Sequence, residues 1–280
     1  MATCYRHPDR ETGLSCGECE RPICHDCMTV TPVGVRCPEH AGQRRGVGLR
    51  MPAGLRSGTR GDAAPLVVPV LIGLNIFVFG VNLVQGASLG ENGGALFVDW
   101  LLFGPLVAAG DWWRIVTAAF LHGSLLHLGM NMLMLWWIGS PMEAALGRAR
   151  FVALYFASAL AGSAGALVWT PTAPTVGASG AIFGILGAAL VFERQRHYVL
   201  GGSALTIVVL NLVFTFAVPN ISIGGHVGGL AGGALAGLAL SRFGRGHAAY
   251  GTPGLVGIAG IVGVALLSLA VAYWRVQPYA

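Results

Sequence analysis

The sequence predicts an all-α polytopic membrane protein with seven transmembrane helices, preceded by a small zinc-stabilised domain. The chain has 280 residues, of which 54% are hydrophobic and only 10% are charged. This composition is typical of membrane proteins with several spans and unlike that of a soluble enzyme. Residues 1–40 differ from the rest, because they are polar and contain all six cysteines.

The head, residues 1–40, is expected to bind two structural zinc ions. Its cysteines and two of its histidines form four pairs, each with two residues between the partners: Cys4 and His7, Cys16 and Cys19, Cys24 and Cys27, and Cys37 and His40. Two tetrahedral zinc sites would use all of these ligands. About 40 residues cannot build an adequate core, so metal would supply the folding energy. Disulfides are the alternative, but the regular spacing and the two histidines argue against them.

The four pairs resemble a B-box-type zinc finger. The resemblance implies cross-braced sites, in which one ion is held by Cys4, His7, Cys24 and Cys27 and the other by Cys16, Cys19, Cys37 and His40. Sequential pairing is the alternative, and the sequence leaves both open. His25 lies inside one pair and is expected at the surface.

Residues 41–64 are expected to form a flexible linker rich in glycine and arginine. A basic cluster beside the first span marks the cytoplasmic side of a membrane, and zinc thiolates persist better in a reducing cytosol. The head is therefore expected in the cytoplasm, where a cytosolic protein is a candidate partner. The net charge of +5 reflects arginines that flank the spans, so no nucleic acid partner is expected.

Residues 65–276 are expected to form the membrane domain. Its seven spans are expected at Leu66–Val84, Ile115–Ser140, Phe151–Trp169, Ser179–Phe192, Tyr198–Val218, His226–Leu240 and Leu255–Trp274. Residues 86–112 form an outer loop whose aromatic side chains suit the membrane interface. Arginines gather in the loops assigned to the inside, which puts the N-terminus in the cytoplasm and the C-terminus outside. We expect a bacterial cell membrane as the location.

The fourth span is too short to cross a membrane and carries a candidate nucleophile. From Ser179 to Phe192 it would be about 21 Å long, whereas the bilayer core is about 30 Å thick. It must therefore begin inside the membrane, after non-helical backbone at residues 175–178 that protein or a water-filled cavity covers. Free N–H groups at its start favour an anion. The alternative is that Gly177, Ser179 and Gly180 only allow close packing, since a lone G-x-S-G is a weak signal.

A candidate base opens the sixth span. His226 precedes a stripe of glycines that recur every four residues, at Gly225, Gly229, Gly233 and Gly237. The fourth span offers small residues at the same period, so the two helices could approach closely. In that case Ser179 and His226 would lie at similar depth. An ionisable residue in a span is a functional candidate; the alternative is a histidine bonded in a polar pocket.

The second span adds His122, His127 and Asn131, which should line a cavity because polar groups in a membrane are costly. His127 and Asn131 are four residues apart and share a helix face. A metal site is the alternative, but His-Glu-x-x-His is absent and no intramembrane carboxylate is expected except Glu143, near the inner end. Imidazole and amide groups fit the donors of an oxyanion hole better. With no Asp in any span, a Ser–His dyad is expected.

From about residue 66 to 275 the chain resembles the rhomboid family of intramembrane serine proteases. Five segments carry the resemblance: Gly177-Ala-Ser179-Gly180, Gly225-His226-Val-Gly-Gly229, the spacing of His122, His127 and Asn131, Trp113-Arg114, and Glu143-x3-Gly147-x3-Phe151. One position departs from the family, because Phe183 stands where a tyrosine is frequent. The zinc head lies outside the resemblance.

The resemblance implies a rhomboid-like bundle and an intramembrane endopeptidase without a catalytic cofactor. Ser179 would attack the scissile carbonyl, and His226 would act as general base and then general acid. His127, Asn131 and the Ser179 N–H would stabilise the oxyanion, with His122 and Gly177 supporting that face. Substrates would be single-span membrane proteins within the lipid bilayer, cut near its outer surface. The alternative is an inert relative that binds client proteins; a transporter is disfavoured because paired broken helices are absent.

Overall fold

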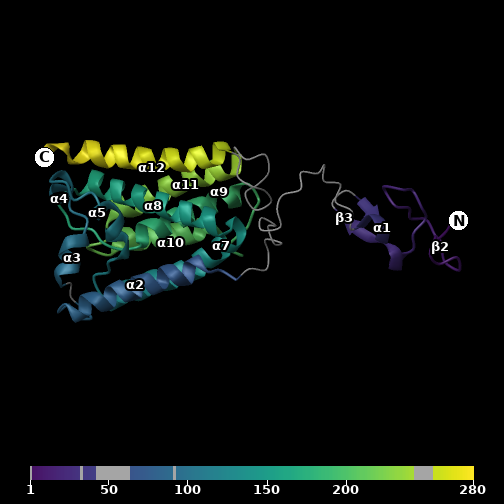
Figure 1. Ribbon diagram of the computed structural model, residues 1–280, viewed down its shortest axis with the longest axis horizontal. Helices are drawn as coiled ribbons and strands as arrows, with labels where there is room; N and C mark the ends of the chain where they lie inside the picture. Colours follow the sequence, from purple (N-terminus) through teal and green to yellow (C-terminus); the bar gives the residue numbers. More distant parts are fainter. Residues whose placement is uncertain (1, 32–33, 42–63, 91–92, 243–254) are drawn as a thin grey trace, which may run out of the picture. The chain divides into compact units, whose positions relative to one another are not determined.

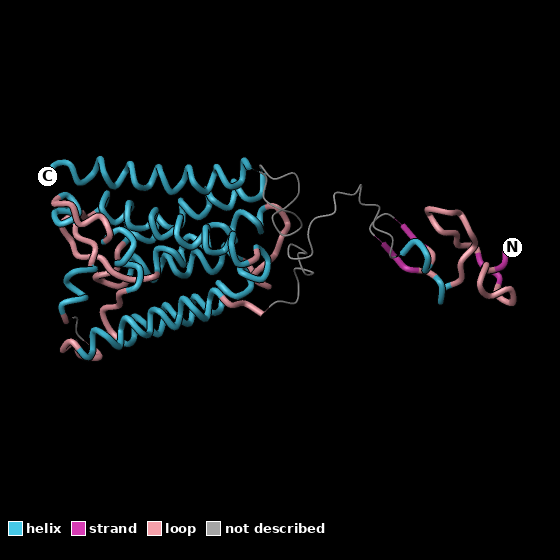
Figure 2. The backbone as a smooth tube through the Cα atoms, viewed as in Figure 1, coloured by secondary structure: helices cyan, strands magenta, loops and turns pink. Residues whose placement is uncertain are grey.

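The computed structural model describes residues 2–31, 34–41, 64–90, 93–242 and 255–280. The chain divides into two units, Met1–Ser57 and Gly58–Ala280. The expected linker, residues 41–64, lies almost entirely outside the described residues. The two units differ in secondary structure: strands occur in the first, whereas the second consists of helices and loops where it is described (Figure 2).

The head is held together by very little apolar packing. Strands β1 (Ala2–Thr3) and β2 (Glu11–Thr12) pair antiparallel, as do β3 (Thr29–Thr31) and β4 (Gly34–Arg36). A short 3₁₀ turn, η1 (His25–Cys27), and one helical turn, α1 (Pro38–Ala41), complete it. Among its described residues, the buried core consists of five cysteines and Ile23. Such a core cannot offset the entropy of ordering the chain unless the cysteines are cross-linked or bind metal.

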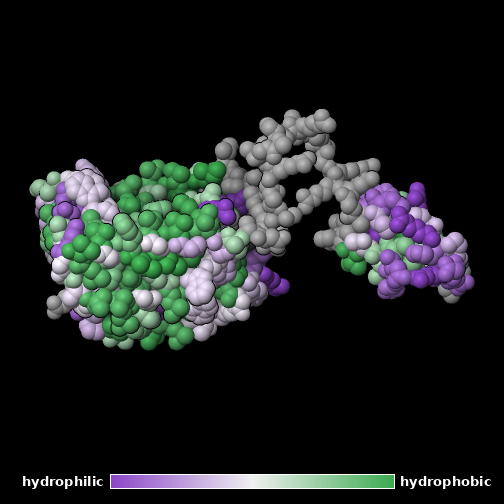
Figure 3. Space-filling model, turned by 60° about the horizontal axis from the view of Figure 1, so that its bottom comes forward, coloured by the Kyte–Doolittle hydropathy of each residue, from purple (hydrophilic) through white to green (hydrophobic). Residues whose placement is uncertain are grey.

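Helices that lie side by side form the membrane unit (Figure 1). They are α2 (Val67–Val84), α8 (Arg148–Trp169), α9 (Ser179–Arg194), α10 (Ala204–Ala217), α11 (Ile223–Arg242) and α12 (Leu255–Val276). Large apolar side chains such as Phe77, Leu210 and Leu266 are exposed, and Figure 3 shows apolar residues covering much of one face. An exposed apolar surface of this extent is expected where lipid is the solvent.

Within the described residues, four helices are long and apolar enough to cross a membrane: α2, α8, α11 and α12. A fifth is added if the bent segment from Arg114 to Leu146 counts as one span. The other two expected spans are shorter, because α9 has 16 residues and α10 has 14. The short fourth helix was expected, whereas α10 was expected to begin at Tyr198. It begins later because the Ser203 side chain caps it, accepting the N–H of Thr206.

The second expected span, Ile115–Ser140, is wrong at its start. Helix α5 (Arg114–Thr117) and a 3₁₀ turn (Ala118–Phe120) come first. The chain then bends by 93° before α6 (Leu125–Met134), a π-helical turn (Leu135–Gly139) and α7 (Ser140–Leu146). Ser124 is the N-cap of α6 and accepts the N–H of His127, which stops the helix from extending backwards. His122 therefore lies in the bend and not on a helix.

Buried Glu143 of α7 ties the second span to the first. Its carboxylate accepts the backbone N–H groups of Leu66, Val67 and Val68 at 2.7, 2.9 and 2.8 Å. These N–H groups at the start of α2 have no acceptor within the helix. A negative charge at this end also interacts favourably with the helix dipole.

The outer loop is a folded element. It contains α3 (Ala95–Trp100) and α4 (Gly104–Ala108). The guanidinium of Arg114, which is 4% exposed, donates to the carbonyl oxygens of Val98 and Leu101 at 2.6 and 3.1 Å. It also forms an ion pair with Asp111 at 2.8 Å. Arg114 therefore joins the end of α3 to the segment around Asp111. The backbone of the loop also pairs, through Leu102, with Thr175 just before α9.

Helices α8, α9 and α11 form the centre of the unit, where their glycines meet. A Cβ on Gly229 would collide with the backbone of Gly180, and a Cβ on Gly233 would collide with that of Gly184. A Cβ on Gly237 would lie 2.8 Å from the Cα of Ala188. The stripes of α9 and α11 therefore face each other in register, with direct backbone contact. This contact brings the first turns of the two helices to the same level.

Candidate active site and metal centres

Ser179 and His226 meet at the start of α9 and α11. The Nε2 of His226 lies 2.7 Å from the Oγ of Ser179. His226 is 7% exposed, whereas Ser179 is only partly buried. The serine therefore combines contact with a base and access to a substrate, which a nucleophile requires.

The backbone before Ser179 is fixed by hydrogen bonds to Leu102 of the outer loop and to Ala118 of the 3₁₀ turn after α5. Residues 175–178 are not helical. The N–H of Gly177 donates to the carbonyl of Ala118 at 2.9 Å. Gly177 adopts φ +124°, a conformation that side chains rarely tolerate. The first N–H groups of α9, beginning with that of Ser179, lack acceptors within the helix and are available to an anion.

Phe183 and Thr215 hold the imidazole of His226 in place. The Phe183 ring stacks on it, with centroids 4.1 Å apart and planes 17° apart. The hydroxyl of Thr215, in α10, lies 2.8 Å from Nδ1. The sequence analysis names Phe183 as a departure from the family pattern, but it does not identify Thr215 as a site residue. The available signal was the spacing of Asn211 and Thr215, four residues apart and so on one helix face, in a segment that is otherwise apolar from Ile207 to Ala217.

His127, in α6, lies close to Gly177 and Ser179. A Cβ on Gly177 would lie 2.9 Å from the Nε2 of His127 and 3.7 Å from the Oγ of Ser179. The missing side chain of Gly177 thus leaves a space bounded by both groups. The N–H of Gly123 donates to Nδ1 of His127 at 3.3 Å, so Nε2 carries the proton in the neutral ring. His127 therefore presents a donor to this space.

Asn131 and His122 are buried next to His127. The Asn131 side chain donates one amide hydrogen to the backbone carbonyl of His127 at 2.9 Å. The ring of His122 lies edge-on to the ring of His127, with centroids 5.0 Å apart. Both residues thus contact His127, and they could fix its position even where they do not touch a substrate.

The cysteines and histidines of the head form two groups whose ligand atoms lie within 4.8 Å of one another. One consists of Cys4, His7, Cys24 and Cys27, and the other of Cys16, Cys19, Cys37 and His40. In the first, Nδ1 of His7 lies 3.3 Å from the sulfur of Cys24 and 3.4 Å from that of Cys27. All six thiols are free. Each group could hold one metal ion, and the grouping follows the cross-braced arrangement.

Each group contains at least one thiol whose pKa lies below its ordinary value. Burial raises the pKa of the Cys4 thiol, but backbone hydrogen bonds from Cys24 and Arg6 lower it, and the resulting pKa is about 6. In the second group, burial again raises the pKa of Cys16, and backbone hydrogen bonds lower it to about 6. Since the thiolate is the form that binds metal, each group contains a cysteine that could bind a metal ion at neutral pH.

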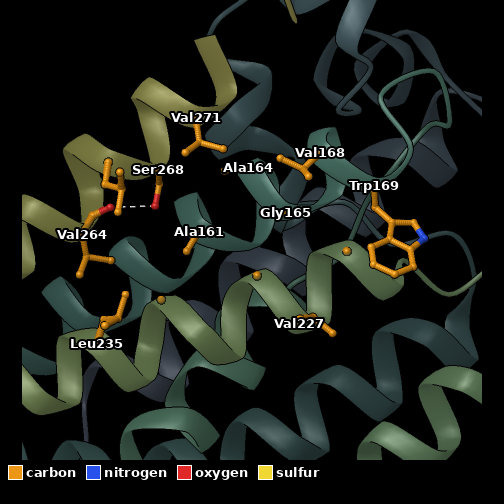
Figure 4. Close-up of a pocket in the computed structure, with 14 residues that line it drawn as sticks. Ala161, Ala164, Gly165, Val168, Trp169, Val227, Leu235, Val264, Ser268 and Val271 are labelled. Atoms are coloured by element: carbon orange, nitrogen blue, oxygen red, sulfur yellow. Dashed lines mark hydrogen bonds between the residues drawn. The ribbon is translucent and has the colours of Figure 1, made fainter. Parts of the chain in front are cut away.

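A separate cavity of about 280 Å³ opens between α8, α11 and α12 (Figure 4). Small and apolar residues such as Ala161, Gly165 and Val271 line it. Its one hydroxyl, that of Ser268, donates to the carbonyl of Val264 at 2.8 Å. With no titratable side chain in its lining, this cavity lacks the groups for acid–base chemistry.

Comparison with known proteins places these residues in a family. The sequence model of the Rhomboid domain matches residues 109–243, which include Ser179 and His226. "Rhomboid protease GluP" of Bacillus subtilis is 36% identical over 218 residues, covering 76% of this chain and 40% of that protein. "Putative rhomboid protease YdcA" of the same organism is 35% identical over 134 residues, covering 46% of this chain and 67% of that protein.

"RHOMBOID-like protein 4" of Arabidopsis thaliana is 29% identical over 208 residues, covering 63% of this chain and 52% of that protein. The alignments with GluP and the plant protein thus span only part of each relative. The alignment with YdcA covers two thirds of its length, and the chain also carries the Rhomboid domain. The protein is an integral membrane protein of the rhomboid family.

Proposed function

We propose that this protein is an intramembrane serine protease that cleaves membrane-protein substrates through Ser179 and His226. The observation that carries the proposal is the 2.7 Å contact between Oγ of Ser179 and Nε2 of His226 at a helix N-terminus. The names of the relatives GluP and YdcA as rhomboid proteases support the same chemistry.

The reaction proceeds in two halves. The Oγ of Ser179 attacks the scissile carbonyl carbon while Nε2 of His226 takes the hydroxyl proton. The tetrahedral intermediate collapses with cleavage of the C–N bond, and His226 gives the proton to the leaving amine. Water then attacks the acyl-enzyme, with His226 again taking and returning a proton. No metal or cofactor is needed for this sequence.

The oxyanion binds where its charge develops, in the space that Gly177 leaves open. The backbone N–H of Ser179 donates from one side and Nε2–H of His127 from the other. Asn131 offers its second amide hydrogen. These donors are fixed before the substrate arrives, so little reorganisation is required as charge appears.

His127→Ala should lower kcat by about 10²–10³-fold with little change in KM, because it removes one preorganised donor to the oxyanion. Asn131→Ala should lower kcat less, since one of its amide hydrogens is already used within α6. His127→Gln retains a side-chain N–H and should recover part of the loss. Kinetics on a purified single-span substrate measure these values. A rise in KM with unchanged kcat would indicate that His127 contributes to substrate binding and not to catalysis.

Substrates are single-span membrane proteins, which enter from the bilayer and are cut near its outer surface. Seven helices form the membrane domain, with the short α9 and α10 completing the rhomboid-like bundle. The N-terminus is cytoplasmic and the C-terminus lies outside. The protein resides in a bacterial cell membrane, and the head is positioned for a cytosolic protein partner.

The head binds two structural zinc ions in cross-braced sites. A tetrahedral ion about 2.3 Å from sulfur and 2.0 Å from nitrogen has ligand atoms about 3.5–3.8 Å apart. The contacts between ligand atoms in the two groups range from 3.0 to 3.9 Å, on either side of this spacing. Cysteine and histidine are also the usual donors for structural zinc. When bound, the ions supply folding energy to the head.

Labelling with a fluorophosphonate probe tests the proposed function directly. The full-length protein in detergent should react at one serine, and mass spectrometry should locate the adduct on Ser179. The reaction should be lost in Ser179→Ala and strongly slowed in His226→Ala. Labelling that persists in Ser179→Ala would contradict the proposal. Ser268→Ala is the matched control, because this buried serine of α12 contacts only a backbone carbonyl among the described hydrogen bonds.

A further inference from the structure

The hydroxyl of Thr215 makes two short contacts with its single oxygen. Its Oγ1 lies 2.7 Å from the backbone carbonyl oxygen of Asn211, one turn earlier in α10, and 2.8 Å from Nδ1 of His226. Thr215 is 1% exposed. Bulk water therefore cannot replace either partner, and both contacts must be satisfied by the protons of these three groups.

Only one arrangement of protons satisfies both contacts. A carbonyl oxygen can only accept, so the Thr215 hydroxyl must donate its hydrogen to Asn211. The hydroxyl oxygen is then left as an acceptor for His226, and Nδ1 must carry the ring hydrogen. The opposite arrangement would leave two acceptor oxygens 2.7 Å apart with no hydrogen between them.

The same arrangement determines the state of the other ring nitrogen. With the hydrogen on Nδ1, the neutral imidazole has its lone pair on Nε2. This nitrogen lies 2.7 Å from the Oγ of Ser179, so it accepts the serine proton. The other tautomer would place a hydrogen between Nε2 and Oγ, and His226 could not act as a base toward Ser179.

We propose that Thr215 is a positioning residue, which holds His226 in the tautomer and orientation that proton transfer from Ser179 requires. It would do for this dyad what a carboxylate does in a Ser-His-Asp triad. The inference rests on the proposed protease function. The hydrogen-bonded series runs from Ser179 through His226 and Thr215 to the carbonyl of Asn211, and Phe183 holds the ring from its face.

A hydroxyl suits this position better than a carboxylate would. An ionised side chain within the membrane is costly to bury, whereas a threonine that bonds to its own helix is not. When His226 takes the serine proton, its ring becomes a cation with two N–H groups. Thr215 accepts from Nδ1–H, and the stacked ring of Phe183 offers a cation–π contact. Both partners thus favour the charged ring without adding a charge of their own.

Thr215→Val tests the role of the hydroxyl, because valine keeps the shape of threonine and carries a methyl group in place of the hydroxyl. It should lower kcat about 10- to 100-fold through loss of this buried hydrogen bond, and KM should stay within about twofold. Thr215→Ser restores the oxygen and should recover most of kcat. Thr206→Val is the matched control, since Thr206 is an exposed threonine of the same helix, and it should retain wild-type activity.

The tautomer itself provides a readout that does not depend on turnover. In full-length protein labelled with ¹⁵N-histidine, the His226 signals can be assigned by their absence in His226→Ala. At a pH where the ring is neutral, wild type and Thr215→Ser should show the hydrogen on Nδ1. In Thr215→Val the population should shift toward the Nε2-protonated form.

The possible outcomes separate this inference from the proposed function. If Ser179→Ala and His226→Ala abolish cleavage while Thr215→Val keeps normal kcat and tautomer, the role of Thr215 is wrong and the protease proposal stands. An equal loss in Thr215→Ser and Thr215→Val would mean that the hydroxyl by itself does not restore activity, which also overturns the inference. If Ser179→Ala still cleaves, both proposals fail.

Discussion

Ser179→Ala and His226→Ala should each reduce cleavage of a single-span substrate by about 10⁴-fold or more, to the level of the assay background. The nucleophile and its base act as a unit, so removing either one stops formation of the acyl-enzyme. For the same reason, the double variant should be no worse than either single variant. Purified full-length protein with a fluorescent substrate in detergent provides the measurement.

Structural collapse must be separated from lost chemistry in this experiment. Both variants should keep the thermal transition of the wild type, because neither side chain is needed for the glycine contacts between α9 and α11. Ser268→Ala and His197→Ala are matched controls at other positions of the membrane unit and should cleave normally. Turnover near the wild-type rate in His226→Ala would show that the dyad assignment is wrong.

The proximity of Ser179 and His226 could be predicted from the sequence, because regularly spaced glycines indicate which helix faces pack closely. Small residues every four positions leave a flat stripe on each helix, and two such stripes allow direct backbone contact. Once the stripes are in register, the depth of any residue in the first turn follows. The contacts of Gly229 with Gly180 and of Gly233 with Gly184 realise this arrangement.

Thr215 could not be anticipated in the same way. Its role depends on how α10 rotates and on how close it lies to α11, and α10 has no glycine stripe to record that contact. A threonine in an apolar helix usually bonds to its own backbone, and Thr215 does so as well. Only the distance to His226 distinguishes it from an ordinary helical threonine.

The start of the second span illustrates a different limit. Hydropathy is continuous from Ile115 onward, so composition alone gives one long span. At the bend Ser124 caps α6, and the N–H of Gly177 donates to the carbonyl of Ala118. The first contact is local and the second joins segments far apart in the chain, and a hydropathy pattern shows neither. His122 was consequently assigned to a helix that it precedes.

Removal of metal should unfold the head, residues 1–40. Apart from the cysteines, Ile23 is the only buried apolar residue in the core of the head among the residues that the structure describes, so apolar packing contributes little to its stability. A structural zinc site contributes an apparent binding free energy of about 10–16 kcal/mol at neutral pH, far more than this core supplies. Elemental analysis of the full-length protein should find two zinc ions per chain, one for each Cys/His group.

Cys16→Ser should lose one ion and loosen the whole head, including the group that contains Cys4. In the cross-braced arrangement each site takes ligands from two separate stretches, so each ion helps to position the other. Hydrogen exchange should become fast throughout residues 1–40, while α8, α9 and α11 keep their protection. His25→Ala, beside the ligand Cys24, is the matched control and should retain both ions. Slow exchange in the head after complete chelation would show that its fold does not depend on metal.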